Sequence, residues 1–142
     1  LFRSRRYRGR VSGPLLDRID LLVPLPPVSV SELGAASEGP TSAEVRARVI
    51  AAREAQRARA LGRSDVTALN AYLAPRALRE VTLLDDTARA LLASAGERMR
   101  LSARAITRAL RVARTIADLE GEKLVAAVHV AEAVGYRANG LG

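Results

Sequence analysis

The stretch LSARAITRALRVARTIADLEG, residues 101–121, decides the fold because it has the clearest hydrophobic periodicity in the chain. Its apolar residues recur every three or four positions along one wide arc, namely Ile106, Ala109, Leu110, Ala113, Ile116 and Ala117. This spacing predicts an amphipathic helix with one face in a core. We expect the opposite face to carry Arg104, Arg108, Arg111 and Asp118. Ser102 is the predicted N-cap, and Gly121 predicts the end of the helix.

Further helices are predicted on both sides of this one. A long helix is expected to begin after Thr41 or Ser42, with Glu44 in its first turn, and to end at Gly62. One of its faces should meet the core through Val45, Val49, Ala52 and Gln56, while another carries Arg46, Arg53 and Arg57. Shorter helices are expected near 67–72, 75–80, 85–98 and 126–136. Since aromatic residues make up only 3% of the chain, the core must be built from Ala, Leu, Val and Ile.

The first forty residues follow a different pattern. The stretch SGPLLDRIDLLVPLP, residues 12–26, predicts a helical turn at 14–18 followed by a short strand at 19–23. The residues after it are rich in Pro, Ser and Gly, which is typical of a linker. We therefore predict a helix-strand piece at 1–24, a linker at 25–40 and a helical domain at 41–142.

Composition limits the possible functions. The net charge is +8, and arginine supplies all but one of the basic residues, the exception being Lys123. This balance favours nucleic acid or nucleotide phosphates as partners, although a GC-rich genome also raises the Arg and Ala content. The chain has no cysteine, which excludes disulfides within it, and no apolar run of about 18 residues that would span a membrane. His129 is the only histidine and is expected to pack or cap a helix rather than bind a metal.

Four stretches in one order carry a family resemblance: SGPLLDRIDL (12–21), NAYL (70–73), residues 101–121 and HVAEAVGYR (129–137). Together they resemble the C-terminal part of the magnesium-chelatase-like AAA+ ATPases of the YifB/ComM group. The resemblance implies a mainly α fold, an AAA+ C-terminal helical lid bundle preceded by a short helix-strand remnant of the α/β ATPase core. It also implies a longer parent protein whose upstream part holds the phosphate loop, because no Gly-x-x-x-x-Gly-Lys-Ser/Thr motif occurs here.

The same resemblance implies roles for three arginines. Arg18 matches the arginine finger that reaches in trans into the nucleotide site of a neighbouring subunit, where a permanent planar cation stabilises phosphoryl transfer. Asp17 or Asp20 would hold Arg18 while that site is empty. Arg104 matches the sensor-2 arginine that contacts ATP phosphates of its own subunit, with Arg108 as the next choice. From the residues alone, a structural ion pair around Arg18 and a solvated helix arginine at Arg104 stay open.

The implied parent is a bacterial cytoplasmic ATPase that uses ATP and Mg²⁺ and forms a ring of identical subunits, a hexamer. Its expected work is DNA helicase or branch-migration activity in recombination or natural transformation. No cofactor is expected on this chain alone, and no membrane is expected as a partner. One alternative is a magnesium-chelatase motor subunit that drives metal insertion into a porphyrin. The other is a DNA-binding helical module that acts without nucleotide through its arginine faces.

Overall fold

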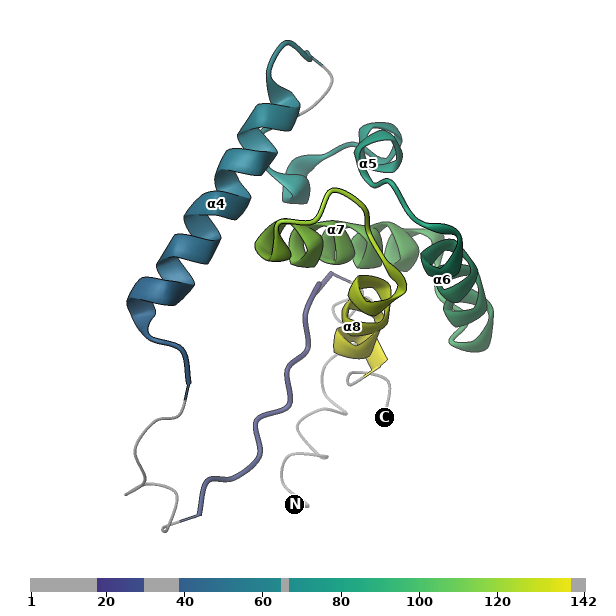
Figure 1. Cartoon of the computed structure of the whole chain (residues 1–142). Helices are drawn as coiled ribbons and strands as arrows, with labels where there is room; N and C mark the ends of the chain where they lie inside the picture. The colour runs from purple at the N-terminus through teal and green to yellow at the C-terminus, as the bar shows by residue number, and fades with distance from the viewer. Residues whose placement is uncertain (1–17, 30–38, 65–66, 139–142) are drawn as a thin grey trace.

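The computed structural model describes residues 18–29, 39–64 and 67–138. These ranges form α-helices and one short 3-10 helix, labelled here as in Figure 1. In chain order the elements are α4 (Ser42–Ala60), η1 (Asn70–Tyr72), α5 (Pro75–Val81), α6 (Asp86–Arg98), α7 (Ala103–Glu120) and α8 (Ala127–Ala138). The prediction of a mainly helical fold is confirmed.

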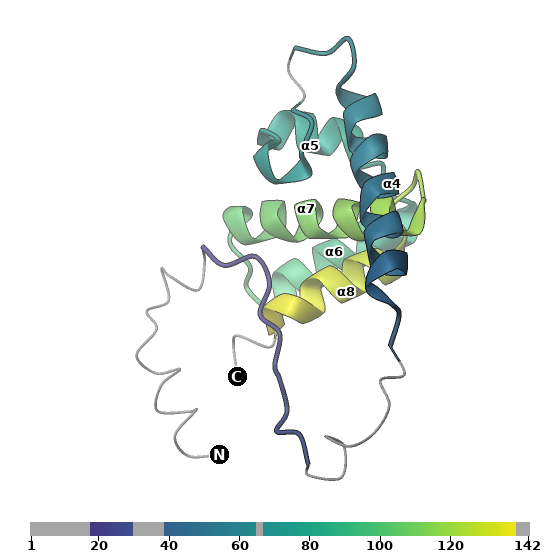
Figure 2. The same cartoon turned by 90° about the vertical axis from the view of Figure 1, so that its left-hand side faces the viewer.

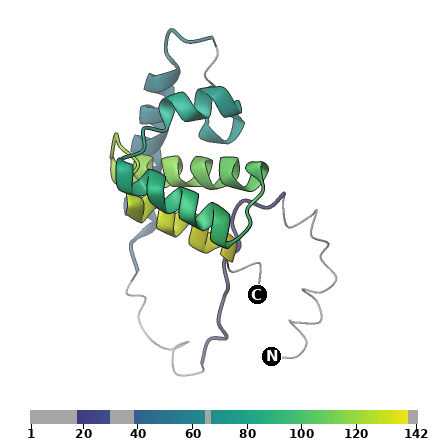
Figure 3. The same ribbon diagram turned by 90° about the vertical axis from the view of Figure 1, so that its right-hand side faces the viewer.

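Helix α7 is the centre of the bundle. It packs against α8, α4, α5 and η1, and α6 packs in turn against α8 (Figure 2). Figure 3 shows α6 and α8 lying together on one side of α7, with α5 on the other. The side chains of α7 contribute to both buried clusters, because Leu110 joins the cluster under α5 while Ala113 and Ala117 join the cluster with α6 and α8. The periodicity of residues 101–121 therefore identified the element around which the domain packs.

The predicted helix boundaries are set by local capping. The side chain of Ser102 accepts a hydrogen bond from the backbone N–H of Ala105 at 3.1 Å, as its N-cap position requires. Gly121 follows the same helix with a φ of 77°, the left-handed conformation that glycine adopts at little cost. At the start of α4, Thr41 and Glu44 form a reciprocal capping box. These caps confirm the predictions. The sequence could predict them because each cap depends only on residues that are neighbours in sequence.

The core face predicted for α4 is only half correct. Ala52 and Gln56 are buried, but Val45 and Val49 are each 43% exposed. Figure 1 shows the reason, since the first turns of α4 lean away from the other helices, and the buried residues of α4 begin only at Ala52. The predicted helix at 67–72 is also shorter than expected, being reduced to the three residues of η1.

The predicted strand at 19–23 does not form. Residues 21–29 have no regular secondary structure, and no strand ladder exists within the described ranges, where the one β-bridge joins Leu84 and Val125. A strand needs a second strand to pair with, and this segment meets helices instead. The predicted helical turn at 14–18 lies outside the described residues except for Arg18. The boundaries proposed for the segments 1–24, 25–40 and 41–142 remain predictions.

Candidate functional site

The three arginines predicted as site residues lie in three different environments. Arg18 is exposed in a turn at the start of the described segment 18–29. Arg104 is exposed in the first turn of α7. The side chain of Arg108 lies one turn further along α7 and is only 17% exposed. The three residues therefore differ in how readily they could reach a ligand.

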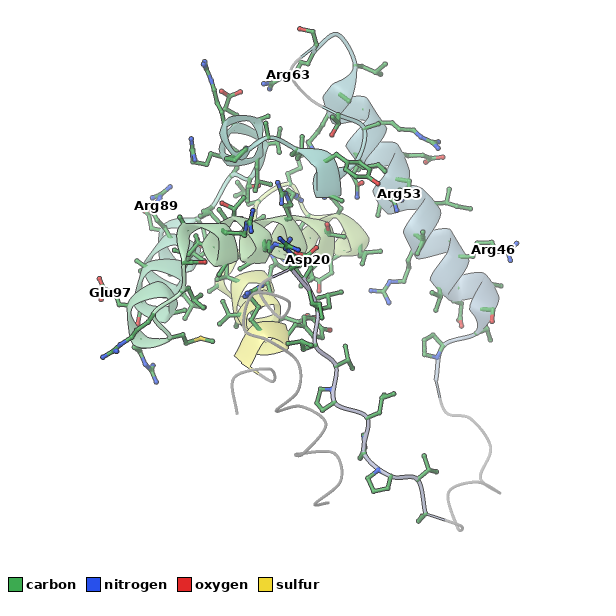
Figure 4. All side chains as sticks on the ribbon, turned by 180° about the vertical axis from the view of Figure 1, so that it is seen from behind. Asp20, Arg46, Arg53, Arg63, Arg89 and Glu97 are labelled. Carbon is green, nitrogen blue, oxygen red and sulfur yellow. The ribbon has the colours of Figure 1, made fainter. Side chains whose placement is uncertain are left out.

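The side chain that neutralises Arg108 is Asp20. Their Nη1 and Oδ1 atoms lie 3.0 Å apart, and Figure 4 shows Asp20 lying over α7. Asp20 was one of two residues expected to hold Arg18, so that prediction is wrong for Asp20. The other, Asp17, lies outside the described residues. Within the described residues Arg18 makes no hydrogen bond or ion pair, and the alternative of a structural ion pair through Asp20 is excluded.

The amino-terminal end of α7 combines two features that favour an anion. Backbone N–H groups of a first helical turn have no partner within the helix and lie at the positive end of the helix dipole. Arg104 adds a guanidinium there that has no ion pair within the described residues. Arg108 already has a carboxylate partner, so Arg104 is the more accessible cation of the two.

The other end of α7 holds a buried ionic network that the sequence analysis missed. Asp118, predicted to face solvent, is 4% exposed, and Arg114 is 1% exposed. Both oxygens of Asp118 accept hydrogen bonds from Arg59 of α4, at 2.7 and 2.5 Å. Arg114 Nε donates to Asp118 at 3.1 Å, and Asn70 Nδ2 donates to it at 2.8 Å. This bidentate geometry between Arg59 and Asp118 joins α4 to α7.

The remaining donors of Arg114 are used by the following loop. Its Nη1 donates to the carbonyl oxygen of Lys123 at 2.7 Å, and its Nη2 donates to that of Glu122. Burial lowers the pKa of Arg114, and the carboxylate of Asp118 opposes that shift. Arg111 is engaged as well, donating from Nη2 to the carbonyl oxygen of Leu73 at 2.8 Å. Of the four arginines on α7, only Arg104 therefore has no partner within the described residues.

His129 has a structural role, as expected. It is 3% exposed, its Nδ1 accepts a hydrogen bond from the N–H of Ala126 at 2.9 Å, and its Nε2 lies 2.8 Å from Glu120 Oε2. With Nδ1 accepting, Nε2 carries the proton and donates to the carboxylate. His129 thus caps α8 and ties it to the end of α7.

ATP and Mg²⁺ fit this part of the molecule only partially. Arg18 and Arg104 could each meet phosphate oxygens, as cations without a partner in the described ranges. No group of three or more His, Cys, Asp or Glu residues that could hold a metal occurs among the described residues. In the same ranges, no helix is long and apolar enough to cross a membrane. The described residues therefore include exposed cations but no cluster of metal ligands.

Fold and site together define a helical bundle with an exposed arginine at the amino-terminal end of its central helix. Residues 39–137 match the family model described as magnesium chelatase, subunit ChlI C-terminal. This chain belongs to that family. The resemblance to the YifB/ComM group is thereby confirmed.

Individual relatives agree with the family match. The competence protein ComM of Haemophilus influenzae is 42% identical over 134 residues, which cover 94% of this chain and 25% of that protein. The YifB protein of Salmonella typhimurium is 42% identical over 135 residues, and that of Escherichia coli is 40% identical over 135, with the same coverages. The chain spans about a quarter of the length of the curated relatives it matches.

Proposed function

We propose that this chain is the lid-bearing C-terminal part of an AAA+ ATPase that works as a ring of identical subunits, a hexamer. The observation that carries the proposal is the difference among the arginines of α7. Arg108, Arg111 and Arg114 are engaged by protein groups, whereas Arg104 at the helix N-terminus has no partner within the described residues. A cation in that state is available for a ligand phosphate.

Arg18 and Arg104, both without a partner within the described residues, each have one role in this proposal. Arg104 binds ATP phosphates of its own subunit, so that lid position follows nucleotide state. Arg18 reaches the nucleotide of the neighbouring subunit and stabilises negative charge during hydrolysis of ATP to ADP and phosphate. ATP supplies the phosphoryl group, with Mg²⁺ held by residues outside this chain. Family membership supports both assignments.

The proposed work of the ring is movement along DNA in the bacterial cytoplasm, as a helicase or branch-migration motor. A net charge of +8 supports a polyanionic partner. The relative named as a competence protein supports a role in natural transformation or recombination.

The test is ATP turnover by the full-length protein that contains this chain, with and without DNA. Arg18→Ala should lower kcat by about 10³-fold or more, the effect of removing a finger, while ATP still binds. Arg104→Ala should weaken ATP binding as well as turnover. Arg76→Ala, an exposed change on α5, is the matched control and should behave as wild type. Normal hydrolysis by Arg18→Ala would refute the finger assignment.

The same experiment separates the motor from a magnesium-chelatase subunit. The family model is named for the chelatase, and both kinds of protein would use Arg18 and Arg104. Stimulation of turnover by DNA would favour the motor. The chelatase would be favoured if DNA left the ATP turnover rate unchanged and if the protein, with the other subunits of a chelatase, inserted Mg²⁺ into a porphyrin.

A second candidate function, nucleic-acid binding without nucleotide, is favoured by the surface of α4. Arg46, Arg53 and Arg57 are exposed along one flank of that helix, spaced seven and four residues apart. Figure 4 shows Arg46 pointing away from the bundle. Neither Arg46 nor Arg57 has a partner within the described residues, and Arg53 bonds only to the neutral Gln56. Such a stripe is complementary to a phosphate backbone.

Salt-dependent DNA binding by the chain tests this second function. A triple variant in which Arg46, Arg53 and Arg57 are each changed to Gln should bind DNA more weakly. The slope of log affinity against log salt should fall in magnitude by about 0.9 for each phosphate that the protein no longer neutralises. The same triple change at Arg76, Arg79 and Arg98 removes equal charge from other surfaces and should alter the slope less. If both triple variants changed the slope equally, the arginines of α4 would contribute to DNA binding only through the net charge of the chain.

A further inference from the structure

The segment that carries Arg18 is fastened to the same helix that carries Arg104. Asp20 lies two residues after Arg18 and pairs with Arg108 at 3.0 Å. Arg108 lies four residues after Arg104, which places the two arginines on neighbouring turns of one face of α7, about 6 Å apart along the axis. The Asp20–Arg108 ion pair, a charge contact in which Arg108 Nη1 makes no hydrogen bond, therefore links the segment that carries Arg18 to the helix that carries Arg104.

Two contacts with the end of α8 support this bridge. The backbone N–H of Leu22 donates to the carbonyl oxygen of Tyr136 at 3.1 Å, and Arg137 Nη1 lies 3.4 Å from the carbonyl oxygen of Ile19. Figure 2 shows the segment starting beside the amino-terminal end of α7 and passing the carboxyl-terminal end of α8. Residues 19–22 are thus held from two helices of the lid.

Partial burial makes the Asp20–Arg108 pair different from the exposed ion pairs of this chain. The side chains of Arg108 and Asp20 are 17% and 52% exposed, whereas those of Arg76 and Glu80 on α5 are 88% and 40% exposed. Water and salt screen a pair less when one partner is shielded. Arg76–Glu80 is therefore a matched control, an arginine–carboxylate pair that lies within α5.

We propose that Asp20 and Arg108 are positioning residues. They make the segment that carries Arg18 move together with α7, the helix that carries Arg104. The inference rests on the proposed function, in which Arg18 acts in trans and Arg104 in cis. ATP bound by Arg104 would shift α7, and the Asp20–Arg108 pair would carry that shift to Arg18. Each subunit would then report its own nucleotide state to its neighbour's active site, and the coupling would act in both directions.

The structural half of the inference can be tested on this chain without nucleotide. Asp20→Asn keeps the shape of the side chain and removes its charge, so the segment should loosen while the bundle stays folded. Hydrogen exchange at the Leu22 amide should then become faster by about tenfold, since its protection depends on the segment staying against α8. Arg76→Gln should leave that amide unchanged. Unaltered exchange at Leu22 in Asp20→Asn would overturn the inference.

The functional half needs the full-length ATPase and a double-mutant cycle. Asp20→Asn should lower kcat by about tenfold with the KM for ATP unchanged, because it acts through Arg18 and not on bound ATP. In an Arg18→Ala background the same change should have no further effect. The charge exchange Asp20→Arg with Arg108→Asp should recover part of the lost kcat. A merely structural role would instead lower activity by the same factor in both backgrounds.

The possible failures are distinguishable. Normal hydrolysis by Arg18→Ala would refute the finger role of Arg18 in the proposed function. The Asp20–Arg108 pair would then have no catalytic group to position. Loss of hydrolysis in Arg18→Ala with wild-type kinetics in Asp20→Asn would refute the positioning role alone. A lower KM for ATP in Asp20→Asn would show that Asp20 competes with nucleotide for Arg108, which would make Arg108 a phosphate ligand and overturn the inference.

Discussion

The two ends of α7 use arginine in opposite ways. At the carboxyl-terminal end, Arg114 is enclosed by Asp118 and by loop carbonyl groups, and Arg59 closes the network from α4. At the amino-terminal end, Arg104 is exposed and has no partner within the described residues. A few turns of one helix therefore separate a cation that holds the fold together from one that is available to a ligand. The residue type does not decide its role; burial and the nearest carboxylate do.

The largest effect should come from removing the carboxylate of the buried end. Asp118→Ala would leave the guanidinium of Arg114 buried without its counter-charge and would break the ion pair with Arg59. Breaking a buried pair in this way costs about 3–5 kcal/mol. The loss in the free energy of unfolding can be measured by urea denaturation monitored by circular dichroism. A destabilisation below about 1 kcal/mol would show that the network is only incidental to the fold.

A smaller effect is expected for Arg59→Ala, which removes only the partner from α4. Arg59 is 26% exposed at its side chain, and Asp118 would keep its hydrogen bonds with Arg114 and Asn70. We expect the free energy of unfolding to fall by about 1–3 kcal/mol. Arg59→Lys should recover little of it, because an ammonium cannot make the bidentate contact. Full recovery by Lys would mean that charge alone matters there.

The capping box of α4 should make stability depend on pH. Hydrogen bonds from the Thr41 side chain and backbone lower the pKa of Glu44 below its usual value of 4.5. The folded state therefore binds this proton less readily than the unfolded state, so the contribution of Glu44 is present above about pH 4.5 and is lost as the pH falls through the lowered folded value. Glu44→Gln should flatten the acid limb of the unfolding free energy. Glu54→Gln, a change at a residue without a partner in the described ranges, is the control and should not.

The smallest effect on stability should come from the exposed end of α7. Arg104→Ala removes no hydrogen bond or ion pair within the described residues, so the free energy of unfolding should change by less than about 0.5 kcal/mol. Together with a loss of ATP binding in the full-length protein, that result would separate a ligand-binding arginine from a structural one. A destabilisation as large as that of Arg59→Ala would place Arg104 among the structural arginines and erase the contrast between the two ends.

How far the site could be predicted depended on the range of each interaction. Arg18 and Arg104 were selected through a family resemblance, and their roles remain proposals. Asp118 was assigned to the solvent side because it lies on the face opposite the apolar arc of α7, where helical spacing alone cannot show a neighbour. Its i, i+4 spacing from Arg114 was the one available signal. Arg59, which lies 59 residues away from Asp118, had none.

The sequence by itself determined the helices, their caps and the apolar face of α7. Those features depend on residues within one or two turns of one another, as the hydrogen bonds of Ser102 and Thr41 show. Only the tertiary structure decided which arginines are buried, why Val45 and Val49 stay exposed, and that Asp20 faces Arg108 rather than Arg18. The physical reason is that a charge or an apolar side chain is buried by whatever packs over it. Here that partner comes from a segment distant in the chain.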